Sequence, residues 1–319
     1  MTKVFSVLGD SISTFEDVIP RGWRVYYAGD LRAETGVCEV VDTWWMQVIE
    51  HFKGKLVANA SFSGSLVEGS GFPAASSDER VRALGGSKRG GHGTCAAPER
   101  PDAVLVFIGI NDYGWGGACA QTLAHGNALP AFEQVRQAGD PVAPGAVGPE
   151  APARFGQAYQ DMLAKIRHEF PRAEVWCVTL VPGRVRGEAQ STFAYNLRGA
   201  AIDEYNEAIR QAAANAGCKV ADIAAFGLEY EASDGTHPTS LGMRQIAAMT
   251  IAAMEGLAAD SAPETWPMAL SAEDAWRAER PCVDRACVAC EHRVSTANPW
   301  YLVCGRQIRS SHPEFDPYL

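Results

Sequence analysis

Hydrophobic positions along the chain fall into short apolar runs and longer stretches with helical spacing. The runs predicted as strands are Val4–Leu8, Leu56–Ala60, Ala103–Ile108, Val175–Leu180 and Lys219–Ile223. Helices are predicted at Thr43–Phe52, Arg154–Phe170, Asn196–Ala216 and Leu241–Ala258. Strands that alternate with helices favour a parallel sheet covered on both faces. We therefore predict an α/β fold with a flavodoxin-like, five-stranded parallel sheet in the order 2-1-3-4-5.

Two helix starts are predicted from single residues. Asp42 precedes the first predicted helix and is expected to be its N-cap, because a short polar side chain there can accept a backbone N–H. Pro238 is expected to open the last helix, at a position where proline is tolerated. Residues 15–40, 69–100, 113–153 and 182–195 are expected to be loops that shape the pocket.

Polar groups suited to catalysis follow four of the predicted strands. They are Gly9-Asp10-Ser11, the stretch 61–65, the stretch 109–112, and a loop after the fifth strand that holds Asp234 and His237. In open α/β sheets ligands bind beyond the carboxyl ends of the strands. We therefore expect these groups to meet in one active site.

The residue types at this edge are those of a serine hydrolase. Ser11 can be the nucleophile, and His237 the base that takes its proton. The three-residue separation of Asp234 and His237 lets the carboxylate accept from Nδ1, so that Nε2 faces Ser11. The predicted oxyanion donors are the backbone N–H of Ser11, the backbone N–H of Gly64, which has no Cβ, and the amide of Asn111.

Taken together, the four motifs resemble the SGNH (GDSL-like) hydrolase superfamily. They are Gly9-Asp10-Ser11-Ile12-Ser13, Gly64 at the end of Asn59-Ala-Ser-Phe-Ser-Gly, Gly109-x-Asn111-Asp112, and Asp234-x-x-His237-Pro238. The resemblance covers roughly residues 3–256 and implies a three-layer α/β/α sandwich, an esterase-type activity and no cofactor for catalysis. We assign residues 1–258 to an SGNH hydrolase domain and 259–319 to a cysteine-containing extension.

Other polar and aromatic residues are interpreted more conservatively. The histidines without a neighbouring aspartate in a strand-to-helix loop are interpreted as solvated or loop residues: His51, His92, His125, His168, His292 and His312. Asp10 is expected to cap backbone N–H groups of its turn, and Asp112 to be a structural partner of its loop. At most one of Trp44 and Trp45 is expected to face the site. Stacking on a sugar or acyl group and plain loop packing stay open for Trp23, Tyr26, Tyr27, Tyr113 and Trp115.

The sequence contains nine cysteines. Four of them, Cys282, Cys287, Cys290 and Cys304, have a spacing that resembles a structural zinc site but lacks the usual second C-x-x-C pair. A structural zinc ion and four reduced, unligated thiols are equally good interpretations. The other five are interpreted as buried small apolar residues.

Charge and hydropathy exclude several classes of partner. The net charge of −10 disfavours nucleic acid and anionic membranes, and only short basic stretches occur, at Lys88-Arg89 and Arg184/Arg186. No apolar run is long enough for a membrane helix, and no secretory signal precedes the first strand, so we expect a cytoplasmic protein. The sequence does not predict the oligomeric state.

The function predicted from the sequence is hydrolysis of a carboxylic ester, through an acyl-enzyme on Ser11. The expected substrate is a small-molecule or glycan ester with a short acyl group, such as acetyl on a carbohydrate. Two alternatives stay open at this point. One is a zinc-stabilised interaction protein on an SGNH scaffold, and the other is an acyltransferase of the same superfamily.

Overall fold

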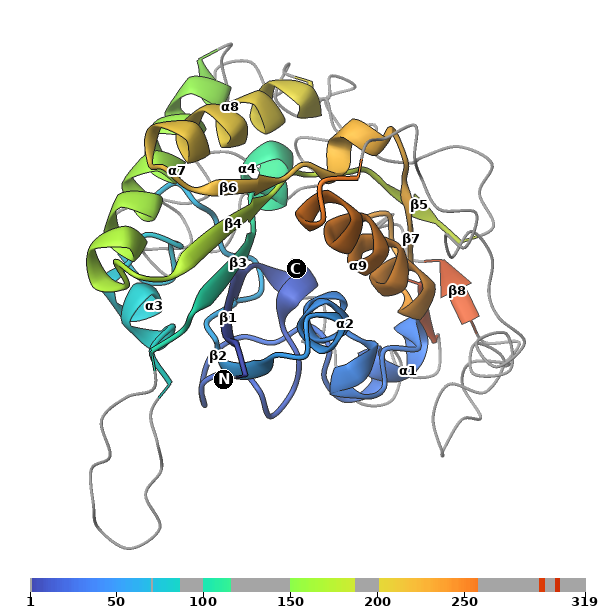
Figure 1. The fold of residues 1–319 in the computed structure, drawn as a ribbon. Helices are drawn as coiled ribbons and strands as arrows, with labels where there is room; N and C mark the ends of the chain where they lie inside the picture. Colours follow the sequence, from blue (N-terminus) through green and yellow to red (C-terminus); the bar gives the residue numbers. More distant parts are fainter. Residues whose placement is uncertain are drawn as a thin grey trace, which may run out of the picture.

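The fold was analysed in a computed structural model (Figure 1). It describes residues 2–69, 71–86, 100–115, 150–186 and 201–257, and small strands at 293–295 and 302–304. For residues 114, 115, 185, 293–295 and 302–304 only the backbone is described.

A five-stranded parallel sheet forms the centre of the molecule. Its strands are β1 (Val4–Gly9), β2 (Lys55–Asn59), β3 (Ala103–Phe107), β4 (Glu174–Val178) and β6 (Lys219–Ala221). Their order, β2-β1-β3-β4-β6, confirms the predicted flavodoxin-like arrangement. Every neighbouring pair is parallel. The residues of β3 are all buried, as a strand covered on both faces requires.

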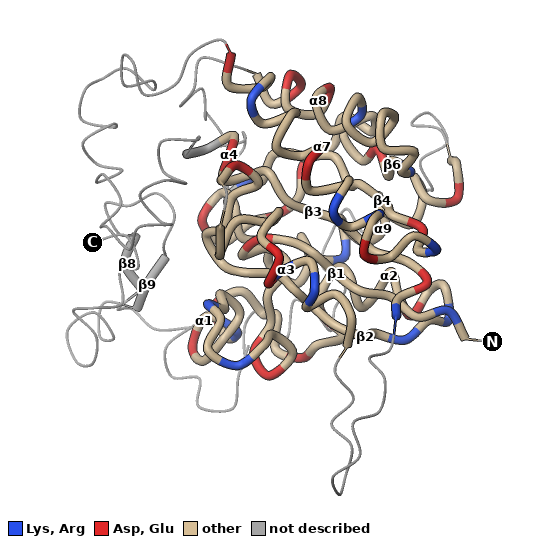
Figure 2. The backbone as a smooth tube through the Cα atoms, turned by 90° about the vertical axis from the view of Figure 1, so that its left-hand side faces the viewer, with Lys and Arg blue, Asp and Glu red and all other residues tan. Residues whose placement is uncertain are grey.

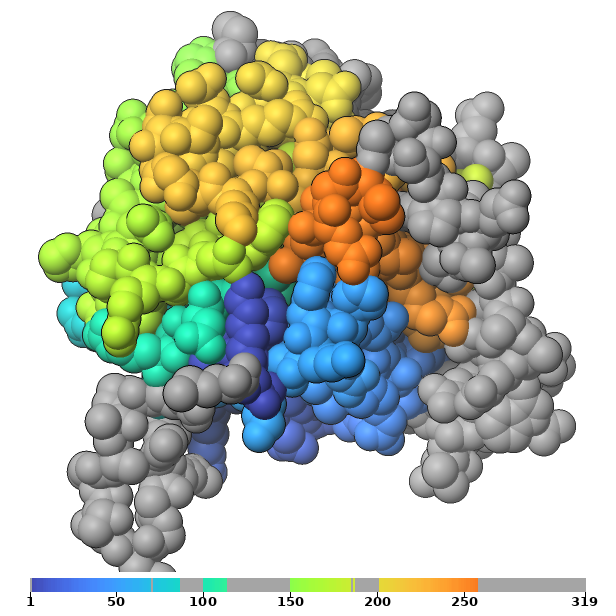
Figure 3. All heavy atoms as spheres, viewed as in Figure 1, coloured from blue at the N-terminus to red at the C-terminus, as the bar shows by residue number. Residues whose placement is uncertain are grey.

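Helices cover both faces of the sheet, which makes the fold a three-layer α/β/α sandwich. On one face α2 (Trp44–His51) packs against α9 (Ser240–Met254), and the two form one continuous surface in Figure 3. On the other face lie α3 (Asp78–Ala83), α7 (Ala151–Glu169) and α8 (Ile202–Asn215), with α7 packed against both others (Figure 1). The apolar core fills both interfaces between sheet and helices.

Several short elements lie outside the strands and helices that the sequence predicted, or extend beyond them. The helices among them are α1 (Asp30–Thr35), α4 (Ile110–Trp115) and the 3-10 turns η1 (Ser11–Ser13), η2 (Val40–Asp42) and η3 (Ile223–Phe226). The strands are β5 (Gly183–Val185), which pairs in parallel with β7 (Tyr230–Ala232), and β8 (Arg293–Ser295), which pairs with β9 (Leu302–Cys304). The loop that holds Asp234 and His237 therefore follows β7, not the fifth strand of the main sheet.

Both predicted helix starts were wrong by one or two positions. Thr43, not Asp42, is the N-cap of α2, and its side chain accepts from the Met46 N–H. Asp42 instead accepts from the N–H groups of Cys38 and Glu39, so it closes the preceding turn. The last helix begins at Ser240 with Thr239 as its cap, so Pro238 lies just outside it.

Opposite charges alternate over the surface of the described part. Figure 2 shows acidic and basic residues interspersed along the backbone. The basic pair Arg184 and Arg186 lies beside Glu229 and Glu231, at 3.7 Å and 3.1 Å. Among the described residues, no helix combines the length and the apolar character that crossing a membrane requires.

Candidate functional site

The candidate site lies at the carboxyl ends of the central strands. Strand β1 has β2 on one side and β3 on the other, so the chain order reverses beside it. At such a point the connections leave in opposite directions and open a crevice. Ser11 follows β1, Gly64 follows β2 and Asn111 lies in the first turn of α4 after β3. The fold thus brings the predicted residues of these three motifs to one edge.

A continuous chain of hydrogen bonds joins Ser11, His237 and Asp234. The Nε2 atom of His237 lies 2.9 Å from the Oγ of Ser11, and its Nδ1 lies 2.6 Å from Oδ2 of Asp234. All three residues are buried. With the ring proton on Nδ1, donated to the carboxylate, Nε2 is free to accept the Ser11 proton.

The loop of Asp234 and His237 is held by its own backbone. Oδ1 of Asp234 accepts the N–H groups of Thr236 and His237, at 2.9 Å and 2.7 Å. Gly235 takes a positive φ of 97°, which allows the tight turn. The Tyr230 hydroxyl donates to the Thr236 carbonyl at 2.6 Å and so joins the loop to β7. One carboxylate therefore shapes the loop through Oδ1 and orients the imidazole through Oδ2.

The turn that presents Ser11 is fixed from both sides. Asp10 accepts the Ile12 N–H at 3.1 Å, so its expected capping role is confirmed. Burial raises the pKa of the Asp10 carboxyl to about 6, against the lowering effect of this hydrogen bond and of the nearby His237 and Arg80 charges. The indole N–H of Trp44 donates to the Ser13 hydroxyl at 3.1 Å, and that of Trp45 to the Ser13 carbonyl at 3.0 Å. Both tryptophans are fully buried in α2 and stabilise the turn from there.

Gly64 and Asn111 occupy positions suited to oxyanion donors. Gly64 has a φ of 77°, which favours glycine. The Asn111 amide donates one hydrogen to the Ser65 carbonyl at 2.9 Å, and an amide has a second hydrogen to offer. The neighbouring Asp112 accepts the N–H groups of Val67 and Glu68, which confirms it as a structural partner of this loop.

Arg80 is a buried residue of the site that the sequence did not reveal. Its guanidinium donates to the carbonyls of Gly9, Ala60 and Pro73 and, at 2.6 Å, to the Ser65 hydroxyl. Burial lowers its pKa to about 9, so the group still carries its charge at neutral pH. The planar guanidinium of Arg80 thus connects the β1 turn with the loop after β2 through hydrogen bonds to both.

Among the described side chains, the ring of Tyr26 stacks on the imidazole. Its ring lies parallel to that of His237, with centroids 3.5 Å apart, and its hydroxyl lies 3.4 Å from Oδ2 of Asp234. The neighbouring Tyr27 donates to the Pro238 carbonyl at 2.9 Å, and Tyr113 packs edge-on against Tyr205. These contacts show that Tyr26, Tyr27 and Tyr113 pack within the protein, and stacking on a sugar or acyl group stays a prediction for the loop aromatics.

Comparison with known proteins agrees with this arrangement. Residues 3–134, which contain three of the four motifs, match the GDSL-like Lipase/Acylhydrolase family. Over these residues the chain is similar to the GDSL-like, or SGNH, hydrolases. The similarity supports an ester-hydrolysing enzyme. No curated protein matches the chain.

Solved structures of GDSL-like lipases and of a phospholipase resemble this chain over most of its length. A candidate GDSL-like lipase from Bacteroides uniformis is 22% identical, over 80% of this chain and 97% of that one, with a TM-score of 0.49. A candidate GDSL-like lipase from Bacteroides ovatus is 21% identical, over 80% and 99%, with a TM-score of 0.47. Phospholipase A1 from Streptomyces albidoflavus is 17% identical, over 81% and 100%, with a TM-score of 0.43. Likeness at this level concerns the fold alone.

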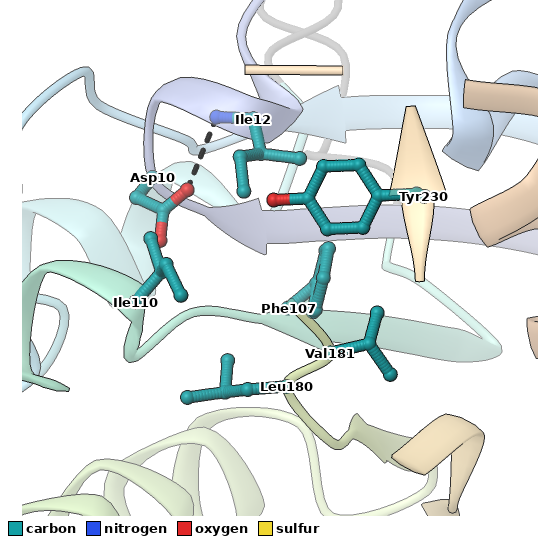
Figure 4. A pocket seen from close by; sticks show the side chains of 7 residues that line it. All are labelled: Asp10, Ile12, Phe107, Ile110, Leu180, Val181 and Tyr230. Atoms are coloured by element: carbon teal, nitrogen blue, oxygen red, sulfur yellow. Dashed lines mark hydrogen bonds between the residues drawn. The ribbon is translucent and has the colours of Figure 1, made fainter. Parts of the chain in front are cut away.

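A small apolar hollow lies beside the Ser11 turn (Figure 4). Seven buried residues line it: Asp10, Ile12, Phe107, Ile110, Leu180, Val181 and Tyr230. It has no space that would hold a water molecule. In this conformation the hollow is therefore a gap between packed side chains, not a binding pocket.

Some candidate residues lie apart from the site or outside the described residues. His51 lies on the surface, with its ring 2.7 Å from Glu255. Within the part of the chain whose side chains are described, no group of histidine, cysteine and acidic residues could hold a metal ion. The side chains of Cys282, Cys287, Cys290 and Cys304 lie outside that part, as do residues 259–292 and the side chain of Trp115, so the zinc site and the separate extension stay predictions.

Proposed function

We propose that Ser11, His237 and Asp234 are a catalytic triad that hydrolyses carboxylic esters through an acyl-enzyme. The observation that carries the proposal is the unbroken hydrogen-bond chain from the Ser11 hydroxyl through the imidazole to the Asp234 carboxylate. Its geometry matches the roles of nucleophile, general base and orienting acid. The hydrogen-bond chain thus contains the nucleophile, the general base and the orienting acid of the reaction.

In the first half-reaction, the Ser11 Oγ attacks the ester carbonyl while Nε2 of His237 takes the hydroxyl proton. The resulting tetrahedral intermediate carries a negative oxygen. When it collapses, the ester C–O bond breaks and the alcohol leaves with the proton from Nε2. In the second half-reaction water attacks the acyl-Ser11 in the same way and releases the acid. An acyltransferase would differ only in that another alcohol takes the place of this water.

The proposed oxyanion hole consists of the Ser11 N–H, the Gly64 N–H and the Asn111 amide. Support comes from the position of Ser11 between the loops of the other two residues, and from the second amide hydrogen of Asn111. Donors fixed in advance stabilise charge that develops in the transition state, each by about 2.7–4 kcal/mol. Arg80 would keep the first two donors in register, because it binds both loops.

We further propose a substrate with a short acyl group, such as acetyl carried by a carbohydrate or another small alcohol. The support is the close packing of the described residues beside the Ser11 turn, which would have to open less for an acetyl group than for a long acyl chain. A series of p-nitrophenyl esters from acetate to decanoate tests this. We expect kcat/KM to be highest for acetate or propionate, and a maximum at long chains would contradict the proposal.

The triad is tested by Ser11→Ala, with Ser63→Ala as the matched control. Ser63 is also buried after β2, but its hydroxyl makes no hydrogen bond within the described residues. We expect Ser11→Ala to lose at least about 10³-fold in kcat on p-nitrophenyl acetate with an unchanged circular dichroism spectrum. The Ser63 variant should stay active. A fluorophosphonate probe should label Ser11, which mass spectrometry can locate. Full activity of Ser11→Ala would refute the triad.

A further inference from the structure

The segment that carries Tyr26 also brings an unpaired cation to the site. Arg24 is exposed, and within the described residues its guanidinium has no hydrogen bond and no acidic partner. Its carbonyl accepts the Ser63 N–H at 3.0 Å, which fixes its backbone beside the loop of Gly64. An arginine without a partner at the edge of an active site is available for a ligand.

The Arg24 side chain reaches over the proposed oxyanion donor. Its Nη1 atom lies 3.7 Å from the point where a Cβ on Gly64 would be. Two residues further on, the ring of Tyr26 lies against His237. The cation therefore lies close to Gly64, whose N–H is a proposed oxyanion donor.

An apolar wall adjoins this cation. Trp23, Phe62 and Phe72 pack against one another, with ring centroids 5.1–6.1 Å apart. Phe72 is 37% exposed, so the cluster presents ring surface to solvent. Arg24 directly follows Trp23, and Gly64 lies two residues after Phe62. A ligand at this place meets one positive charge and an apolar surface.

We propose that Arg24 is a substrate-binding residue, selecting esters whose alcohol carries an anionic group, a carboxylate or a phosphate. This rests on the proposed function. The alcohol is assigned to this side because it must leave into solvent after acylation, and Arg24 is exposed. A guanidinium binds either anion with paired hydrogen bonds, which the neutral analogue cannot accept equally well. The aromatic cluster would contact the body of the same alcohol.

The experiment compares three acetate esters that differ in the charge of the alcohol. They are 4-acetoxybenzoate, 4-acetoxyphenyl phosphate and the neutral 4-acetoxybenzamide. We measure kcat/KM on each for the wild type, Arg24→Gln, Arg24→Lys and the control Arg21→Gln, which removes an exposed arginine three residues earlier. For each variant we divide kcat/KM on an anionic ester by kcat/KM on the neutral ester. The intrinsic reactivity of the esters then cancels when variants are compared.

We expect Arg24→Gln to lower this ratio by roughly three- to tenfold, within the range of charge-assisted contacts at a solvated site. Arg24→Lys should keep part of the preference, and Arg21→Gln all of it. The effect should shrink at about 1 M salt, where the screening length is about 3 Å. A loss confined to the phosphate ester or to the benzoate identifies the anion. An unchanged ratio, or an equal loss on all three esters, would overturn the proposal.

The same design separates this proposal from the proposed function. Turnover of the esters with an anionic-to-neutral ratio that Arg24→Gln leaves unchanged would refute the anion site alone. If the wild type cleaves none of the esters, the anion site is tested by the affinities of two analogues that resist hydrolysis. They are the anionic 4-acetamidobenzoate and the neutral 4-acetamidobenzamide. Tighter binding of the anionic analogue that depends on Arg24 would support the site, and equal binding of the two would refute it.

Discussion

The ring of Tyr26 lies flat on the imidazole of His237, with 3.5 Å between centroids and 6° between planes. The same side chain places its hydroxyl 3.4 Å from the carboxylate that holds the other side of the imidazole. Tyr26 thus restricts the position of the His237 ring. Stacking stabilises a cationic ring more than a neutral one, so its effect should be largest when His237 has taken the proton.

We predict that Tyr26→Leu lowers kcat by about 5–30-fold, because the lost stacking is worth about 1–2 kcal/mol in a desolvated site. Tyr26→Phe keeps the ring and should stay within about threefold of wild type, since it loses only a long hydrogen bond. KM should change little in both variants. Steady-state kinetics on p-nitrophenyl acetate gives both constants.

Tyr27→Phe is the matched control, because Tyr27 is equally buried but contacts Pro238 instead of the imidazole. It should keep the wild-type kcat. If Tyr26→Leu raised KM with kcat unchanged, Tyr26 would be a substrate contact. If the Phe and Leu variants lost equally, the hydroxyl would be the important group.

The sequence predicted the sheet and the Ser11–His237–Asp234 constellation because both depend on short-range or period-based signals. Asp234 and His237 are three residues apart, so their contact is local. Ser11 reaches them because the loop after β7, a strand outside the main sheet, lies at the carboxyl end of β1. Arg80 could not be predicted in this way. It lies in a Gly- and Ser-rich stretch, and its four acceptors come from residues 7 to 71 positions away, which no local pattern brings together.

Tyr26 and the strands β5 and β7 show two further reasons why parts of the structure could not be predicted from the sequence. An aromatic in a loop has no periodic neighbours, so only the assembled fold decides which ring it meets. Strands of three residues are too short for alternation to be visible, and their pairing depends on the distant segments 183–185 and 230–232 coming together.

For Arg80, we predict that Arg80→Met destabilises the protein by about 3–5 kcal/mol, because three carbonyls and a hydroxyl lose their buried donor. Arg80→Lys should cost less but still reduce activity, since an ammonium cannot reproduce the planar fork. Urea unfolding gives the free energies. Arg82→Met, in the same helix but on the surface, should change stability by no more than about 0.5 kcal/mol. A similarly small change in stability for Arg80→Met would show that the β1 turn and the loop after β2 keep their structure without Arg80.

Removing the Asn111 amide tests the proposed oxyanion hole. We predict that Asn111→Ala lowers kcat by about 10²–10³-fold with little change in KM, because the amide acts on charge that forms only in the transition state. The substitution also removes the hydrogen bond to Ser65. Asn206→Ala controls for this structural loss, since Asn206 is a buried amide that binds the backbone of Leu180 away from the reacting groups. An Asn111 effect on KM alone would make the residue a binding group.

The buried carboxyl of Asp10 should make stability depend on pH. Its pKa is raised by burial from 3.8 to about 6. An acid with a raised pKa in the folded state is favoured there in its protonated form. Its contribution to stability is therefore fully present below pH 3.8 and is lost as the pH rises through about 6. The loss is on the order of 3 kcal/mol.

Asp10→Asn isolates this effect, because asparagine has the same shape and does not ionise. We predict that the stability of the wild type relative to Asp10→Asn falls between about pH 4 and about pH 6 and is level above about pH 7. Urea unfolding of both proteins across this range measures it. Glu79→Gln, an exposed carboxylate on α3, is the control and should show no such slope. A constant difference between wild type and Asp10→Asn would mean that Asp10 stays ionised throughout. Its hydrogen bond to Ile12 and the nearby charges of His237 and Arg80 would then outweigh its burial.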